Sequence, residues 1–125
     1  MLKILLVGSG GFIGSVLRYI ISGAAYRLFE RPWFPYGTLA VNVLGCLLIG
    51  LLSGLAESRQ LFSPEVRLLL FIGFLGGFTT FSTFGYESFN FARDGQWAAT
   101  MLNICLQVVL GLAAVWVGHI LSRLF

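Results

Sequence analysis

An apolar stretch near the middle of the chain carries an unusual run of glycine and hydroxyl residues. Gly76 and Gly77 are adjacent, and Thr79 and Thr80 follow after one phenylalanine. Glycine and threonine are poor helix formers, so this pattern predicts a break in a helix. A break frees backbone carbonyl groups between Gly76 and Thr79, and such carbonyls are good ligands for a hard monovalent cation. The alternative is an unbroken helix in which the glycines form a packing notch.

Two phenylalanines follow this run. Phe81 and Phe84 are three residues apart and therefore share a helix face, while Ser82 and Thr83 lie between them on the adjoining faces. A phenyl ring has a positive edge, so inward-facing edges can contact an anion without a full charge nearby. The hydroxyl groups would add hydrogen-bond donors. The alternative is that both rings belong to an ordinary core, in a chain with 12 phenylalanines.

Further polar residues lie inside or at the ends of apolar segments. Asn42 is either an amide donor to an anion or a partner in an interhelical hydrogen bond. Arg18 either forms a positive vestibule for an anion or extends to the lipid headgroups. Glu87 is either a pore-mouth group or a residue at headgroup level. Asn103 and Gln107 are four residues apart, and they either line a pathway or tie helices together.

The composition indicates a membrane environment for these residues. The chain has 125 residues, of which 58% are apolar and only 10% charged, and its mean hydropathy is +0.90. Soluble domains carry about 25% charged residues. Four segments are long and apolar enough to cross a bilayer as helices, at residues 4–26, 38–56, 68–91 and 96–121. We therefore expect residues 1–125 to form a single membrane domain, all-α and integral to the lipid bilayer, with the third of its four transmembrane helices broken near its centre.

The positive charges do not favour one orientation in the membrane. Four spans place both termini and the second connection on one side. The basic residues are Lys3, Arg59, Arg67 and Arg123 on that side, and Arg27, Arg31 and Arg93 on the other, with Arg18 near it. Because the counts are nearly equal, the positive-inside rule gives no firm direction. A chain inserted both ways would show this balance, which suggests an antiparallel homodimer as a hypothesis.

Enzyme and nucleic-acid functions find no support in the sequence. The single histidine, His119, is isolated near the end of the chain, so no group of residues suggests acid–base or nucleophilic catalysis. No run of lysine or arginine suggests nucleic-acid binding.

The first segment contains a misleading glycine pattern. Gly8, Gly11 and Gly14 have the spacing of a dinucleotide-binding loop. That fold needs alternating strands and helices, whereas the rest of this chain consists of apolar spans. We expect these three glycines to lie close to one face of a helix, where they form a flat surface for a neighbouring helix.

Three motifs, in order, resemble the Fluc (CrcB) family of fluoride ion channels over nearly the whole chain. They are GGFIGSVLRY at residues 10–19, PYGTLAVNVLG at residues 35–45, and GFLGGFTTFSTF at residues 73–84. The third motif is the most specific, because hydrophobic bias alone rarely produces it. The first motif carries Ser15 where the family usually has alanine. The fourth span is the least recognisable, with Cys105 and Val109 where a hydroxyl residue of the pore is expected.

The resemblance implies an antiparallel, dual-topology homodimer with two pores and a central sodium ion. Backbone carbonyls at positions corresponding to Gly76 and Thr79 would hold the sodium. The pore residues that the family pattern implies are Phe81, Phe84 and Asn42, with Ser82 and Thr83 on a polar track, Glu87 beside that track and Arg18 near the end of the first span.

The function implied by this resemblance is passive export of fluoride across the plasma membrane, which protects the cell from fluoride toxicity. One alternative is a proton-coupled small multidrug transporter, a class of similar length and topology. Such a transporter needs a titratable carboxylate deep in its first span, and this first span has none. Another alternative is a non-transporting membrane assembly protein, which would explain the glycine-rich helices but not the clustered hydroxyl groups and the phenylalanine pair.

Overall fold

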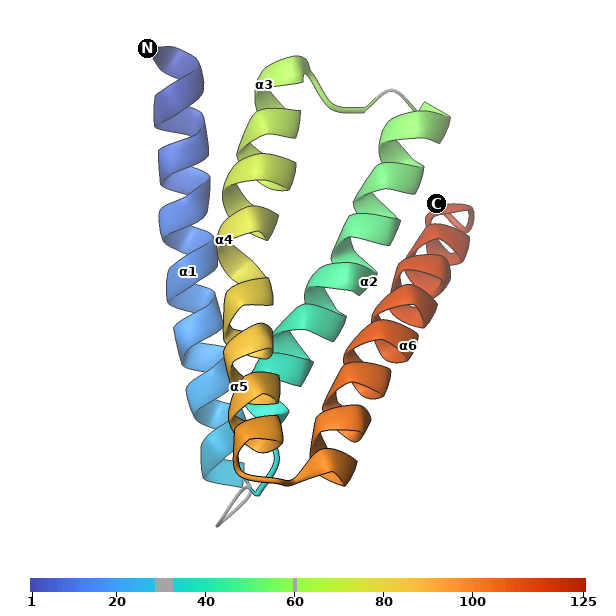
Figure 1. Cartoon of the computed structure of the whole chain (residues 1–125). Helices are drawn as coiled ribbons and strands as arrows, with labels where there is room; N and C mark the ends of the chain where they lie inside the picture. The colour runs from blue at the N-terminus through green and yellow to red at the C-terminus, as the bar shows by residue number, and fades with distance from the viewer. Residues whose placement is uncertain (29–32, 60) are drawn as a thin grey trace.

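The computed structural model describes residues 1–28, 33–59 and 61–125, but not the side chain of Arg59. Every regular element among these residues is helical (Figure 1). The polar connection expected at Glu30, Arg31 and Pro32 lies outside the described residues, and so does Gln60 in the second connection.

Four helical spans make up the described part of the chain. The first, second and fourth are α1 (Leu2–Leu28), α2 (Tyr36–Arg59) and α6 (Trp97–Ser122). The third consists of α3 (Pro64–Arg67), the π-helix η1 (Leu68–Leu75), α4 (Gly76–Phe78) and α5 (Phe81–Arg93). All four spans are long and apolar enough to cross a membrane. The first three helices extend beyond the apolar segments expected from the sequence, and the fourth is shifted by one residue.

The outer surface of the bundle is apolar. Leu5, Phe12, Tyr19, Val109 and Trp116 are among many large apolar side chains that are exposed on the single chain, whereas few large side chains are buried. A soluble monomer rarely exposes so much contiguous apolar surface, and lipid tails solvate it at no cost. The protein is therefore a multi-pass membrane protein.

The four spans associate as two pairs (Figure 1). The first span lies along the third, and α2 lies along α6. A Cβ on Gly14 would collide with the backbone of the third span at Phe74 and Phe78, and a Cβ on Gly118 would collide with the α2 backbone at Leu47. Without side chains at these positions the backbones approach closely, which is how helices gain van der Waals contact inside lipid.

The glycine surface on α1 differs from the one expected. Gly10 and Gly14 are buried against the third span, and the backbone of Gly11 packs closely against Gly77 of that span. A Cβ on Gly8 would meet nothing within 4 Å. The expectation that Gly8 packs with Gly11 and Gly14 is therefore wrong for the single chain, because the helix turns Gly8 away and brings Gly10 onto the contact face.

The third span is broken near its centre, as the sequence predicts. Thr79 (φ −86°, ψ 161°) and Thr80 (φ −149°, ψ 107°) have extended backbones between α4 and α5. Thr80 then caps α5, because its side-chain oxygen accepts a hydrogen bond from the N–H of Thr83. A hydroxyl N-cap restarts the helix by satisfying one of its free N–H groups.

Candidate ion-binding site at the helix break

The break is held by a side chain from another span. The backbone N–H of Thr80 donates to Oδ1 of Asn42 in α2, at 2.8 Å. In a continuous helix this N–H would bond to the carbonyl of Gly76. The N–H of Thr83, which would bond to the carbonyl of Thr79, donates to Thr80 Oγ1 at 3.3 Å. The Gly76 and Thr79 carbonyls thus lose their helical donors.

Asn42 also donates at the break. Its Nδ2 bonds to the Thr80 carbonyl at 3.2 Å and to Oε1 of Gln107 in α6 at 3.0 Å. The Thr80 N–H can only donate, so it fixes the orientation of the Asn42 amide. Oε1 of Gln107 accepts from Asn42, which leaves the Nε2 group as the free end of that amide. Gln107 Nε2 is buried and has no hydrogen-bond partner among the described residues.

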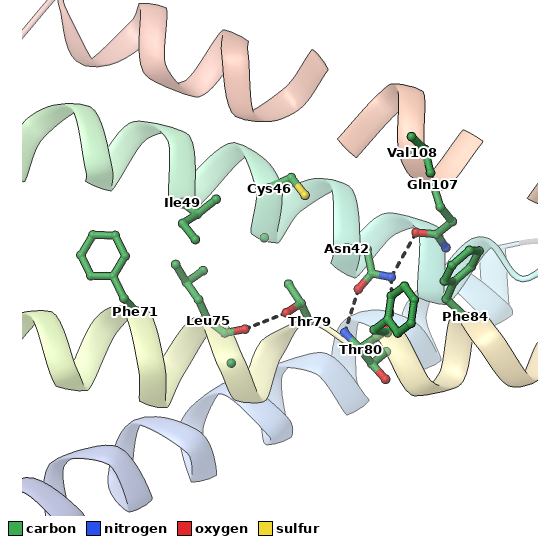
Figure 2. A pocket seen from close by; sticks show the side chains of 13 residues that line it. Asn42, Cys46, Ile49, Phe71, Leu75, Thr79, Thr80, Phe84, Gln107 and Val108 are labelled. Carbon is green, nitrogen blue, oxygen red and sulfur yellow. Dashed lines mark hydrogen bonds between the residues drawn. The ribbon is translucent and has the colours of Figure 1, made fainter. Parts of the chain in front are cut away.

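These residues line an open pocket of about 420 Å³. In Figure 2, Asn42 and Gln107 lie at one end of the pocket beside Phe84, and Phe71 lies at the other end. The complete lining consists of Asn42, Gly45, Cys46, Ile49, Phe71, Leu75, Gly76, Thr79, Thr80, Phe81, Phe84, Gln107 and Val108. The lining contains no formally charged side chain, so polarity comes from backbone carbonyls, two amides and hydroxyl groups.

The two predicted phenylalanines both line this pocket and contact each other. The ring centroids of Phe81 and Phe84 are 5.4 Å apart and the planes meet at 64°, an edge-to-face arrangement. Phe81 is 82% exposed on the single chain, so most of its ring is available to a ligand or to another molecule. In such a pair the positive edge of one ring points at the face of the other, and the ring edges left outside this contact are the ones that can meet an anion.

Arg18 reaches the break from α1. Its guanidinium donates from Nη1 to the carbonyl oxygen of Thr79 at 3.2 Å. This bond holds one of the carbonyls that the break releases, and it leaves one lone pair of that oxygen for another ligand. Arg18 does not line the pocket.

Three other predicted residues lie outside the pocket wall. Ser82 and Thr83 are exposed and interact with the capping hydroxyl of Thr80, at 3.4 Å and 2.9 Å. Glu87 is half-buried, and its Oε1 accepts a hydrogen bond from Thr38 Oγ1 at 2.6 Å. They follow the pocket along α5 towards the end of that helix.

Comparison with known proteins identifies the family to which the chain belongs. The family model for "CrcB-like protein, Camphor Resistance (CrcB)" matches residues 5–119. The chain belongs to this CrcB-like family. Its curated relatives include the "Fluoride-specific ion channel FluC" of Maridesulfovibrio salexigens, which is 49% identical over 99% of this chain and 98% of the relative.

Two further relatives have equivalent lengths and related names. The "Fluoride-specific ion channel FluC" of Geobacter sulfurreducens is 48% identical over 98% of both chains. The "Fluoride-specific ion channel FluC 1" of Methanosarcina acetivorans is 48% identical over 96% of this chain and 90% of the relative. The family resemblance that three sequence motifs indicated is therefore confirmed over nearly the whole length of this chain.

Sequence reasoning left some residues of this CrcB-like site unassigned. Thr80 supplies both the N–H that Asn42 binds and the hydroxyl that caps α5. Its place between an expected break and a renewed helix was a signal for a cap. Gln107 lines the pocket, whereas Asn103 is fully buried and donates to Ser88 at 3.0 Å. The two fourth-span amides, which the sequence treats alike, thus have different surroundings.

Proposed function

We propose that this chain is a fluoride-specific ion channel, not an enzyme, and that it exports fluoride passively across the plasma membrane. The observation that carries the proposal is the Asn42 amide bound at the helix break, next to the edge-to-face pair of Phe81 and Phe84. Its relatives are named for the same activity. Passive loss of fluoride would protect the cell from fluoride toxicity.

The chemistry of the pocket supports passage of a small anion. Fluoride is strongly hydrated, so a narrow site must replace water with donors. The partner-free Nε2 of Gln107 and the ring edges of Phe81 and Phe84 are the free donors near the pocket. Both N–H groups of Asn42 Nδ2 are already bonded, so this amide would donate to fluoride only by exchanging the Thr80 carbonyl or Gln107 Oε1 for the ion. No cationic side chain lines the pocket. Weak, repeated contacts let an ion enter and also leave, whereas a buried full charge would trap it.

Beyond the two phenylalanines, the path follows α5. Ser82 and Thr83 offer exposed hydroxyl groups next to the pocket, and Glu87 lies about one helical turn beyond Phe84. We assign Ser82 and Thr83 to a polar track that receives the anion after the ring pair. Glu87 is tied to Thr38, so we assign it to the wall of that track rather than to direct contact with fluoride. Arg18 stabilises the break by holding Thr79.

The broken helix also suits a structural sodium ion. Gly76 and Thr79 line the pocket, and both carbonyls have lost their helical N–H donors. Hard monovalent cations favour such carbonyl oxygens. In the described part of the chain, no group of three or more His, Cys, Asp or Glu side chains could hold a metal ion. When bound, sodium would supply positive charge that gathers carbonyl oxygens at the break.

A second copy of the chain would complete this cation site. One chain offers two carbonyls, from Gly76 and Thr79, and an added Cβ on Gly76 would meet nothing within 4 Å. The exposed Phe81 also leaves apolar surface beside the pocket. These features, with the balanced basic residues on both sides, support an antiparallel homodimer with two pores around a shared central sodium.

The alternative functions are less well supported. A proton-coupled small multidrug transporter needs an acid deep in its first span, and α1 contains none. A non-transporting assembly protein does not need a pocket with partner-free amide donors. The CrcB-like family and the names of the relatives also favour the channel.

Reconstitution in liposomes tests the channel directly. Liposomes loaded with fluoride are diluted into fluoride-free buffer with a potassium ionophore, and a fluoride electrode follows efflux. We expect rapid efflux without a proton gradient. Efflux no faster than from empty liposomes would contradict the proposal. Proton-driven uptake of a cationic dye in the same liposomes would favour the multidrug transporter.

A further inference from the structure

A second groove lies between the first and third spans, away from the Asn42 end of the pocket at the break. Its volume is about 550 Å³, and it is lined by Lys3, Pro64, Arg67, Leu68, Phe71 and Ile72. Lys3 belongs to the first turn of α1, and Arg67 ends α3. The groove therefore opens where two helices begin, at the level of one membrane surface.

The packing of the helices explains why a groove forms there. The tight contacts between α1 and the third span are made at glycines, and Gly73 lies against the carbonyl of Val7. Nearer the N-terminus, the larger residues Lys3 of α1 and Arg67 and Leu68 of the third span line the groove in place of glycines. Bulkier side chains keep the two backbones apart beyond the last glycine contact.

The groove has a charged end and an apolar end. Lys3 and Arg67 are exposed cations, while Leu68, Phe71 and Ile72 continue along η1 from Arg67. Ile72 follows Arg67 by five residues along η1 and therefore lies deeper in the membrane than Arg67. An acid nearby, Glu65, interacts electrostatically with Lys3 but does not line the groove.

The two cations are available to a ligand. Among residues with described side chains, the ion pair present joins Arg93 and Asp94 at the opposite end of the third span. Paired cations above an apolar groove match a molecule with an anionic head and an aliphatic tail. Basic pockets between transmembrane helices bind anionic lipid headgroups for this reason.

We propose that this groove binds one anionic phospholipid per chain, with the phosphate at Lys3 and Arg67 and an acyl chain along Leu68, Phe71 and Ile72. Phe71 lines both this groove and the far end of the pocket at the break, whereas Phe81, Phe84 and Gln107 line only that pocket. Binding of a lipid here does not depend on the fluoride function. Because the groove carries two cations, we expect it to bind an anionic lipid more tightly than a zwitterionic one. A free phosphate ion would use only the two cations and leave the apolar end empty.

Native mass spectrometry of the full chain in detergent tests this site. Phosphatidylglycerol and phosphatidylcholine with the same acyl chains are titrated into the protein. Allowing for the opposing charge of Glu65, we expect about tenfold preference for phosphatidylglycerol. The double variant Lys3→Gln, Arg67→Gln should lose this preference.

The matched control is Arg27→Gln, Arg123→Gln, which removes two exposed cations outside the groove and changes the net charge equally. The control should keep the wild-type preference, and both double variants should keep the wild-type melting temperature because their substitutions are exposed. Equal affinity of wild type for both lipids would overturn the proposal, as would the same loss in both variants. Displacement of the lipid by an equal concentration of inorganic phosphate would show a free-anion site instead.

Discussion

Asn42 replaces a helical carbonyl as the acceptor for the backbone N–H of Thr80. The bond is 2.8 Å long and joins α2 to the point where the third span is interrupted. The same amide donates to the Thr80 carbonyl and to Gln107. One side chain therefore holds the break open and faces the pocket.

Replacing Asn42 should damage both stability and transport. Asn42→Ala leaves the Thr80 N–H and the Gln107 Oε1 without this partner. An unsatisfied buried group costs about 1–3 kcal/mol, so the free energy of unfolding should fall by a similar amount. Unfolding in detergent measures the first effect, and fluoride efflux from liposomes should fall at least tenfold. Asn90→Ala, in α5 and outside the pocket, is the control and should keep near-normal efflux.

The ring pair should matter for transport more than for folding. Phe81→Ile keeps an apolar side chain of similar bulk but removes the positive ring edge. Because Phe81 is largely exposed, the variant should fold and assemble normally while losing most fluoride efflux. Phe89→Ile changes another exposed phenylalanine of the same helix, outside the pocket, and should behave as wild type. Wild-type efflux from the Phe81 variant would refute the role of the ring edge.

Two glycines of α1 that look equivalent in the sequence should respond differently to alanine. Gly14→Ala forces a Cβ into the backbone of the third span at Phe74, and such overpacking costs about 1–3 kcal/mol. Gly8→Ala meets open space in the single chain and should be neutral or slightly stabilising, because alanine is the better helix former. Thermal unfolding of both variants in detergent makes the comparison. Equal destabilisation would contradict the observed packing of α1.

Removing sodium should weaken the folded assembly. A cation that binds only the native protein stabilises it by mass action. Purified protein moved into N-methylglucamine buffer should therefore melt at a lower temperature and dissociate more readily in size-exclusion chromatography. Adding sodium should restore both properties. If the melting temperature and the elution volume are the same with and without sodium, Gly76 and Thr79 do not form the proposed site.

The proposed antiparallel dimer predicts two orientations in one membrane. A cysteine at Arg123, introduced after Cys46 and Cys105 are changed to serine, reports the side of the C-terminus. An impermeant thiol reagent should label about half of the copies in intact vesicles and the remainder after permeabilisation. Labelling of all copies, or of none, before permeabilisation would show a single orientation. A cysteine at Arg93, near the opposite membrane surface, provides the matched position.

The sequence predicted those features of the site that depend on local composition. Adjacent glycines and threonines indicated a break in the third span, and the spacing of Phe81 and Phe84 indicated a shared face. The bond that holds the break comes from Asn42 in another span, so this partner could not be read from the third span alone. The hydrogen bond from Arg18 to the Thr79 carbonyl likewise joins two spans that are far apart in the sequence, so local composition did not indicate it.

The fourth span shows a different limit of sequence reasoning. Asn103 and Gln107 are four residues apart, so the sequence places them on one helix face. In the structure Asn103 bonds to Ser88, while Gln107 lies in the pocket wall. Which of these two side chains faces α2 and which faces α5 depends on how α6 packs against its neighbours, and glycines determine how closely it packs. Gly118 and Gly111 set that approach through contacts with α2. Small residues indicate that helices meet closely but not which neighbouring side chain they bring together.

Selective flux is the most direct test of the central claim that the pocket at the break passes fluoride. Liposomes containing equal concentrations of fluoride and chloride are diluted into buffer free of both, and two ion-selective electrodes follow efflux under the same potassium ionophore. We predict rapid loss of fluoride while chloride stays inside as in empty liposomes. Retention of fluoride, or loss of chloride at the same rate, would contradict a fluoride-specific channel.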